Sequence, residues 1–134
     1  MRKENTIILD ETDKLLLQHE WESTSLKDKS SGSILFQDMF IGDPTCGIID
    51  MNNNWAVVAG DHLTVWKDNR AQMVNGLNDV HAIRLKNEQV VEVLIDPWST
   101  ESAVWELNIE TLEKAKVRDY LDYRAEPYTD EINW

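Results

Sequence analysis

The chain has 134 residues, 42% of them apolar, a single cysteine and a formal net charge of −12. The length suits one ordinary domain over residues 1–134, and no segment has the apolar run of a signal peptide or a membrane span, so we expect a cytoplasmic protein that needs no disulfide. Because the negative charge repels phosphate backbones and anionic lipid, we expect neither a nucleic acid nor a membrane as partner.

The first third of the sequence is ambiguous. Residues 10–21 (DETDKLLLQHEW) fit a helix, with Asp10 or Thr12 as the N-cap. A strand is the alternative, because the apolar residues 7–9 directly precede this segment. The stretch 27–33 (KDKSSGS) is rich in serine, lysine and glycine and predicts an exposed loop.

From residue 33 onward the pattern is typical of strands. Residues 103–110 (AVWELNIE) alternate apolar and polar side chains, and residues 90–95 (VVEVLI) are β-branched and almost continuously apolar. Helical spacing over 109–124 makes a helix the alternative there, and we favour a turn followed by a strand. The longer connection at 68–79 fits a helical turn. We expect strands near 33–41, 46–51, 55–60, 63–67, 80–86, 89–96, 102–110 and 115–121.

The expected fold is mainly β: an antiparallel meander, arranged as a sandwich or an open barrel-like sheet, with one or two short helices. A meander with tryptophans near its strand ends also resembles propeller blades. Two or three blades cannot close a propeller, and the signature dipeptide is absent. The resemblance is therefore one of architecture and implies no family.

Cys46, in the segment GDPTCGIID (42–50), is the candidate nucleophile. A reactive thiolate needs a nearby base and an oxyanion donor. The candidates are His62 or His81 as the base, Gly47 as the donor, and Asp43, Asp50 or Asp61 as the residue that orients the base. No spacing forces these groups together. Residues 42–45 also fit a type I turn before an apolar strand, so we favour Cys46 as a small core residue.

Metal and phosphate sites lack their usual spacings. The three histidines and the cysteine show no paired zinc-binding pattern, and residues 50–54 lack the glycine and the closing glutamate of a calcium loop. The five glycines do not cluster into a phosphate-binding loop. We therefore expect no cofactor and no metal.

Acidic and aromatic residues occur together toward the end of the sequence. Residues 88–134 carry twelve acidic and four basic side chains. A tryptophan directly after a proline in the predicted hairpin loop 96–101 can anchor an arginine of a partner. In the alternative, Trp98 and the tyrosines pack on the end of the core. The predicted partner-binding residues are Asp96, Trp98, Glu101, Glu106, Glu110, Asp119, Asp122 and Tyr123.

These features predict a non-catalytic acidic protein that blocks a basic protein partner. Bacterial toxin-immunity proteins are an analogy of charge and size. The alternatives are a small cysteine-dependent hydrolase that uses Cys46 with His62 or His81, and a carbohydrate- or peptide-binding module with Trp98 as its platform. A homo-oligomer that buries its own aromatic patch is a further alternative.

Overall fold

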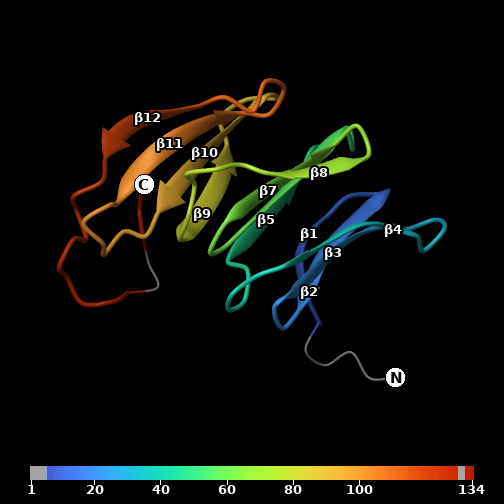
Figure 1. The fold of residues 1–134 in the computed structure, drawn as a ribbon, viewed down its shortest axis with the longest axis horizontal. Helices are drawn as coiled ribbons and strands as arrows, with labels where there is room; N and C mark the ends of the chain where they lie inside the picture. The colour runs from blue at the N-terminus through green and yellow to red at the C-terminus, as the bar shows by residue number, and fades with distance from the viewer. Residues whose placement is uncertain (1–5, 130–131) are drawn as a thin grey trace.

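The computed structural model describes residues 6–129 and 132–134, and these residues form strands and connections without a helix. Three four-stranded antiparallel sheets follow one another along the chain (Figure 1). Within each sheet, every strand pairs with its neighbours in sequence. The first sheet contains β1 (Thr6–Glu11), β2 (Leu15–Glu20), β3 (Ser23–Asp28) and β4 (Ile34–Met39). The second contains β5 (Cys46–Ile49), β6 (Trp55–Ala59), β7 (Leu63–Lys67) and β8 (Arg70–Met73). The third contains β9 (Val80–Leu85), β10 (Val90–Ile95), β11 (Ala103–Asn108) and β12 (Lys114–Asp119).

The eight expected strands are confirmed, but the expected helices are wrong. Residues 10–21 hold the end of β1, a turn and β2, and the connection 68–79 contains β8. Asp10 caps no helix; its carboxylate accepts a hydrogen bond from the Ile49 amide of the second sheet at 2.6 Å. The three separate sheets also differ from the expected sandwich or barrel. Pairing with neighbouring strands determines the secondary structure of these segments, because a short leucine run fits a strand as well as a helix.

Two apolar layers hold the three sheets together. All five residues of β6 are buried, and consecutive ones face opposite layers. Val57 packs between the second and third sheets, whereas Val58 packs between the first and second. A strand covered on both faces needs a continuous apolar run, which explains the sequence WAVVA. The first two sheets approach closely at Gly47, where a Cβ atom would lie 2.5 Å from Leu17 Cδ2.

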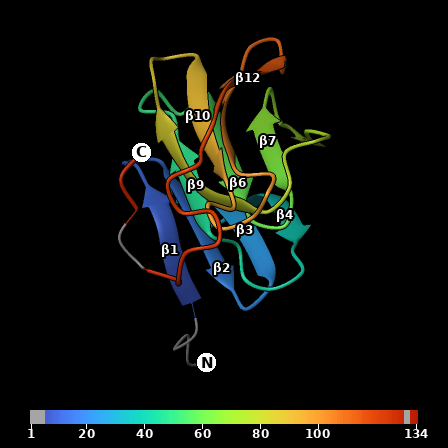
Figure 2. The ribbon, with the colours of Figure 1, turned by 90° about the vertical axis from the view of Figure 1, so that its left-hand side faces the viewer.

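The C-terminal segment, by which we mean residues 120–129 and 132–134, covers the outer face of the third sheet (Figure 2). Leu94 and Val104 of that face are buried under Tyr120, and Tyr123, Ile132 and Trp134 pack against them. The Tyr120 hydroxyl donates to the Asn133 carbonyl at 2.5 Å, and the Arg84 guanidinium lies 4.0 Å above the Trp134 ring. The segment therefore takes the place that a following sheet would occupy.

The outer face of the first sheet carries a polar row, which continues to the exposed Ile8 of β1. Gln18, Ser25 and Gln37 form a cross-strand row there, while their neighbours Leu17 and Leu26 point inward and are fully buried. In stacked repeats the terminal units need a polar or covered outer face to remain soluble. The C-terminal segment covers one outer face of the stack, and the polar row occupies the middle of the other.

Candidate functional site

One end of the three sheets forms a continuous surface. Strand direction alternates along an antiparallel meander, so every second connection falls at the same end. We call the end made by 20–22, 39–45, 60–62, 74–79 and 96–102 the acidic end. Hydrogen bonds join its connections to one another: Gly42 N to Glu22 Oε2 at 2.6 Å, Ile41 N to Asp61 Oδ1 at 2.9 Å, Asp79 N to the Asp61 carbonyl at 3.2 Å, and Asp96 N to the Asp79 carbonyl at 2.9 Å.

The five connections themselves carry charge of one sign, although the Arg124 guanidinium of the C-terminal segment donates to Ser102 of the connection 96–102 at 2.7 Å. Each of the five connections carries at least one carboxylate, and none contains lysine or arginine. The opposite end, formed by 12–14, 29–33, 50–54, 68–69, 86–89 and 109–113, mixes its acids with Lys14, Lys29 and Lys86. An excess of carboxylates over nearby cations produces a field that attracts cations. The carboxylates of the acidic end are Glu20, Glu22, Asp43, Asp61, Asp79, Asp96 and Glu101.

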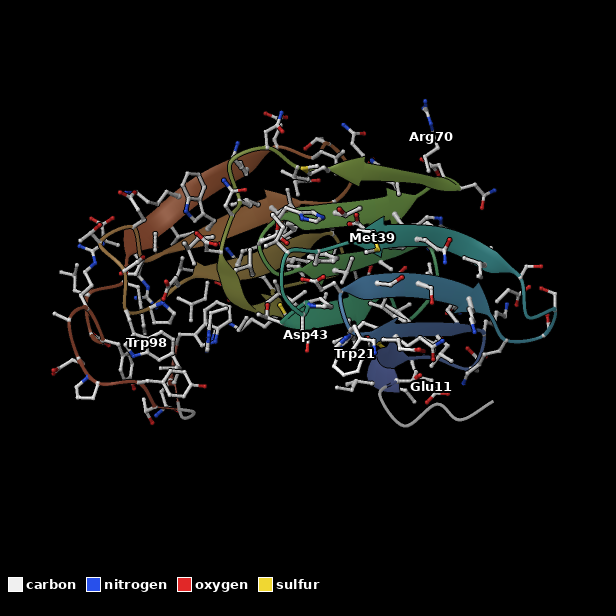
Figure 3. All side chains as sticks on the ribbon, turned by 60° about the horizontal axis from the view of Figure 1, so that its bottom comes forward. Glu11, Trp21, Met39, Asp43, Arg70 and Trp98 are labelled. Atoms are coloured by element: carbon white, nitrogen blue, oxygen red, sulfur yellow. The ribbon has the colours of Figure 1, made fainter. Side chains whose placement is uncertain are left out.

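A pocket of ≈ 260 Å³ opens at the acidic end. Four aspartates line the pocket, and no lysine or arginine does. The size of the pocket and the negative charge of its lining suit a guanidinium or ammonium group. Figure 3 shows Asp43 of this end between Trp98 and Trp21, with Arg70 at the start of β8, toward the other ends of the strands. The lining residues are Ile41, Asp43, Thr45, Gly60, Asp61, Asp79, Val80, His81 and Asp96.

A larger hollow of ≈ 400 Å³ lies at the opposite end. Asp50, Asp68, Glu88 and Glu110 line it, but so does Lys67, whose Nζ donates to the Glu110 carbonyl. The hollow therefore already holds a cation of the chain itself. We place the candidate site in the smaller pocket, because charge decides the attraction of a basic group more than volume does.

Buried polar contacts fix the backbone beside the pocket. The two ring nitrogens of His62 lie 2.8 Å from Asp38 Oδ2 and 3.2 Å from Asp61 Oδ2. Burial opposes the charge on His62, but the hydrogen bonds to Asp38 and Asp61 outweigh it and raise the pKa of His62. Burial likewise opposes ionisation of Asp61, but bonds from the Ile41 amide and His62 lower its pKa on balance. This network holds β4, the connection 39–45 and β7 in one geometry.

The structure places six of the eight predicted binding residues around the acidic end. Asp96, Trp98 and Glu101 lie in the connection 96–102. Asp119 pairs with Ala103 at the edge of that connection, and its carboxylate binds Lys116 Nζ at 2.7 Å. Asp122 and Tyr123 follow in the chain; Tyr123 packs on Tyr120 with ring centroids 5.9 Å apart.

Two of the predicted residues lie elsewhere. Glu106 is in the middle of β11, where Lys86 Nζ neutralises it at 2.5 Å, and Glu110 lies at the opposite end. Trp98 itself is half-buried: its ring lies 5.2 Å from His81 and 4.9 Å from Tyr128, measured between centroids. The ring contacts agree with the interpretation that Trp98 packs on the core, and its exposed part leaves area for contact with a partner.

Cys46 begins β5, as expected for the start of an apolar strand, but residues 42–45 form no hydrogen-bonded turn, because the Thr45 amide donates to the Ala59 carbonyl at 2.8 Å. Its sulfur lies 3.4 Å from Thr45 Oγ1, and burial raises the pKa of the thiol to about 11. An activated nucleophile needs the opposite shift. Of the two candidate bases, His62 binds Asp38 and Asp61, while His81 packs edge-on against Trp98.

Sequence reasoning missed several residues of the acidic end. Asp79 was assigned no role, and Asp43 and Asp61 were considered only as residues that orient a catalytic histidine. The exposed apolar residues Trp21, Met39 and Ile41 lie at the same end and were also missed. The signal for all of them is the alternation of connections, which needs every strand to be assigned correctly.

Residues 6–129 and 132–134 contain no cluster of three or more histidine, cysteine, aspartate or glutamate side chains placed to hold a metal ion. Within the same residues, no helix has the length and apolarity needed to cross a bilayer.

No protein-family model and no curated protein sequence matches the chain, but solved structures resemble its fold. The WD40 β-propeller domain of Doa1 gives a TM-score of 0.58 at 8% identity, covering 83% of this chain and 38% of that one. Hydrazine synthase of Kuenenia stuttgartiensis gives 0.60 at 12%, covering 83% and 34%. The Cps50 (Swd1) β-propeller domain of Myceliophteria thermophila gives 0.54 at 10%, covering 84% and 41%.

The fold is therefore that of three consecutive propeller-type blades. The chain spans less than half the length of each of these three structures. At such low identity the likeness concerns the fold alone.

Proposed function

We propose that this protein is a non-catalytic binding module that holds a basic protein partner at its acidic end. The observation that carries the proposal is the pocket of Asp43, Asp61, Asp79 and Asp96, in a surface whose five connections contain no lysine or arginine. A lysine or arginine of the partner enters this pocket, and the surrounding carboxylates steer the encounter.

The rigidity of the acidic end supports a binding role. Backbone hydrogen bonds join its connections. The Asp38–His62–Asp61 network also holds the connection 39–45, because the Ile41 amide donates to the Asp61 carboxylate. A surface that is already in its bound shape loses little conformational entropy on association. The narrower proposal, carried by charge and size alone, is a cytoplasmic immunity protein of bacteria that blocks a basic toxin by covering its cationic surface.

Two triple variants with the same change of charge test the proposal. The first replaces Asp43, Asp79 and Asp96 by asparagine; the second, at the opposite end, carries Asp13→Asn, Asp68→Asn and Glu88→Gln. Asp79 and Asp68 are matched in backbone, with φ of 53° and 52°, a region that asparagine tolerates. Each immobilised protein is loaded with an extract of the source cell at low salt and eluted with a salt gradient.

We expect the second variant to retain basic proteins as the wild type does. The first variant should release them at lower salt, with an affinity weaker by about 10- to 100-fold. Equal weakening of both variants would mean that only net charge matters, and the acidic end would not be the binding site. Retention by the first variant at the wild-type salt concentration would also contradict the proposal.

A further inference from the structure

Three large apolar side chains are exposed at the part of the acidic end that belongs to the first sheet. Trp21 is 62% exposed, Met39 65% and Ile41 84%. Trp21 lies in the turn between β2 and β3, and Met39 ends β4 directly beside Ser23, the first residue of β3. Exposed apolar groups are ordinary when scattered singly, but several of them at one end of a sheet, bordered by carboxylates, are typical of an interaction surface.

The backbone under these side chains is held by hydrogen bonds. The Glu22 carbonyl accepts a bond from the Phe40 amide at 2.9 Å, and the Glu22 carboxylate accepts one from the Gly42 amide at 2.6 Å. Phe40 faces inward and stacks on His62, with ring centroids 4.1 Å apart. The chain therefore alternates around Phe40, and Met39 and Ile41 are both turned outward.

Trp21 is held in an unfavourable backbone conformation. Its φ is 56°, in the left-handed region that bulky residues rarely adopt, and the His19 ring donates to its carbonyl at 2.9 Å. A glycine or an asparagine would fit this turn with less strain. A strained backbone conformation lowers the stability of the fold, and such conformations are found often at binding sites.

We propose that Trp21, Met39 and Ile41 are the apolar anchor of the interface and that they receive an apolar side chain flanked by arginines or lysines of the basic partner. This inference rests on the proposed function and defines the partner further. Glu20, Glu22 and Asp43 border the three side chains in sequence, and no lysine or arginine lies in these connections. The carboxylates bind the flanking cations, and the tryptophan face can receive a guanidinium group.

The same surroundings argue against the other occupants of an apolar patch. A second copy would bring the same carboxylates face to face with these, and like charges across an interface cost several kcal/mol. An anionic membrane is repelled for the same reason. A basic polypeptide with an apolar residue among its cations satisfies both parts of the surface.

Two synthetic peptides of equal charge test the inference. Both contain four arginines; in one they are interrupted by three leucines and in the other by three serines. We expect the wild type to bind the leucine peptide about tenfold more tightly than the serine peptide, as measured by calorimetry at physiological salt. The variants Trp21→Asn and Ile41→Ser should reduce this ratio towards one.

Met51→Ser is the matched control, because Met51 is 83% exposed, as much as Ile41, but lies at the opposite end. It should leave the ratio unchanged. Trp21→Asn should not lower the thermal midpoint, since asparagine tolerates a positive φ, so its loss of binding is not caused by unfolding.

The outcomes separate the two proposals. If both peptides bind the wild type equally and more weakly as salt rises, the acidic end binds cations and the apolar anchor is wrong. If neither peptide binds, both proposals fail. If Trp21→Asn retains the preference for leucine, the anchor lies elsewhere. If the wild type dimerises and Trp21→Asn is a monomer, the patch is an interface between copies and the inference is overturned.

Discussion

Replacing Tyr120 by alanine will lower the free energy of unfolding by about 3–5 kcal/mol, the usual cost of deleting a buried aromatic side chain. Tyr120 is only 1% exposed and covers Leu94 and Val104 of the third sheet. Without its ring, these residues lose their cover and the C-terminal segment loses its main attachment. A loss of this size is a large part of the stability of a domain. Urea unfolding measures it through the midpoint at unchanged slope.

Tyr120→Phe is the control for this prediction. It keeps the ring and removes only the hydrogen bond from the hydroxyl to the exposed Asn133, so we expect a loss of about 1 kcal/mol. If Tyr120→Ala costs no more than Tyr120→Phe, the ring does not pack on the third sheet and the C-terminal segment does not cover that face.

Replacing His62 by asparagine will destabilise the protein by about 2–4 kcal/mol at pH 5 and by clearly less at pH 9. The pKa of His62 is raised because its bonds to Asp38 and Asp61 outweigh the effect of burial. A raised pKa stabilises the fold fully below the unfolded value, about 6.5, and this contribution is lost as the pH rises through the folded value. The lowered pKa of Asp61 acts in the other direction: its contribution is lost only as the pH falls below about 4.

His81→Asn should show the opposite pH dependence. Burial lowers the pKa of His81 despite the nearby charge of Asp96, so protonation of His81 in acid disfavours the folded state. Removing this histidine should therefore help stability most at low pH. Urea unfolding of both variants and the wild type at several pH values measures these differences. A cost of His62→Asn that does not change with pH would mean that the histidine is neutral in the fold.

The β architecture could be predicted where burial leaves a strong pattern. Residues 55–59 are covered on both faces and are continuously apolar, and 103–108 alternate, so both were predicted as strands. Residues 10–21 could not be decided, because three successive leucines fit the spacing of either element. Only the pairing of β2 with β1 and β3 selects the strand.

One missed strand, β8, explains why Asp61 and Asp96 were not predicted to share a pocket. All four residues of β8 (RAQM) are exposed, so no alternation of polar and apolar residues marks this strand. Without β8, counting connections places 60–62 and 96–102 at opposite ends of the meander. With β8, both connections lie at the acidic end, and Asp61 and Asp96 meet in one pocket. The sequence therefore pointed to acids and aromatics as the binding chemistry but not to the set that comes together.

The two outer faces of the stack of three sheets differ. A complete propeller protects the face of each sheet with the next sheet. Here the row of Gln18, Ser25 and Gln37 leaves a polar face at one end of the stack, and the C-terminal segment covers the apolar face at the other.

Amide hydrogen exchange of this protein, alone and with the basic partner captured from the cell extract, tests the central claim most directly. The acidic end as the binding surface predicts slower exchange in residues 20–22, 39–45, 60–62, 74–79 and 96–102 when the partner is bound. Slower exchange confined to 12–14, 50–54, 68–69 and 86–89, or no difference at the acidic end, would contradict it.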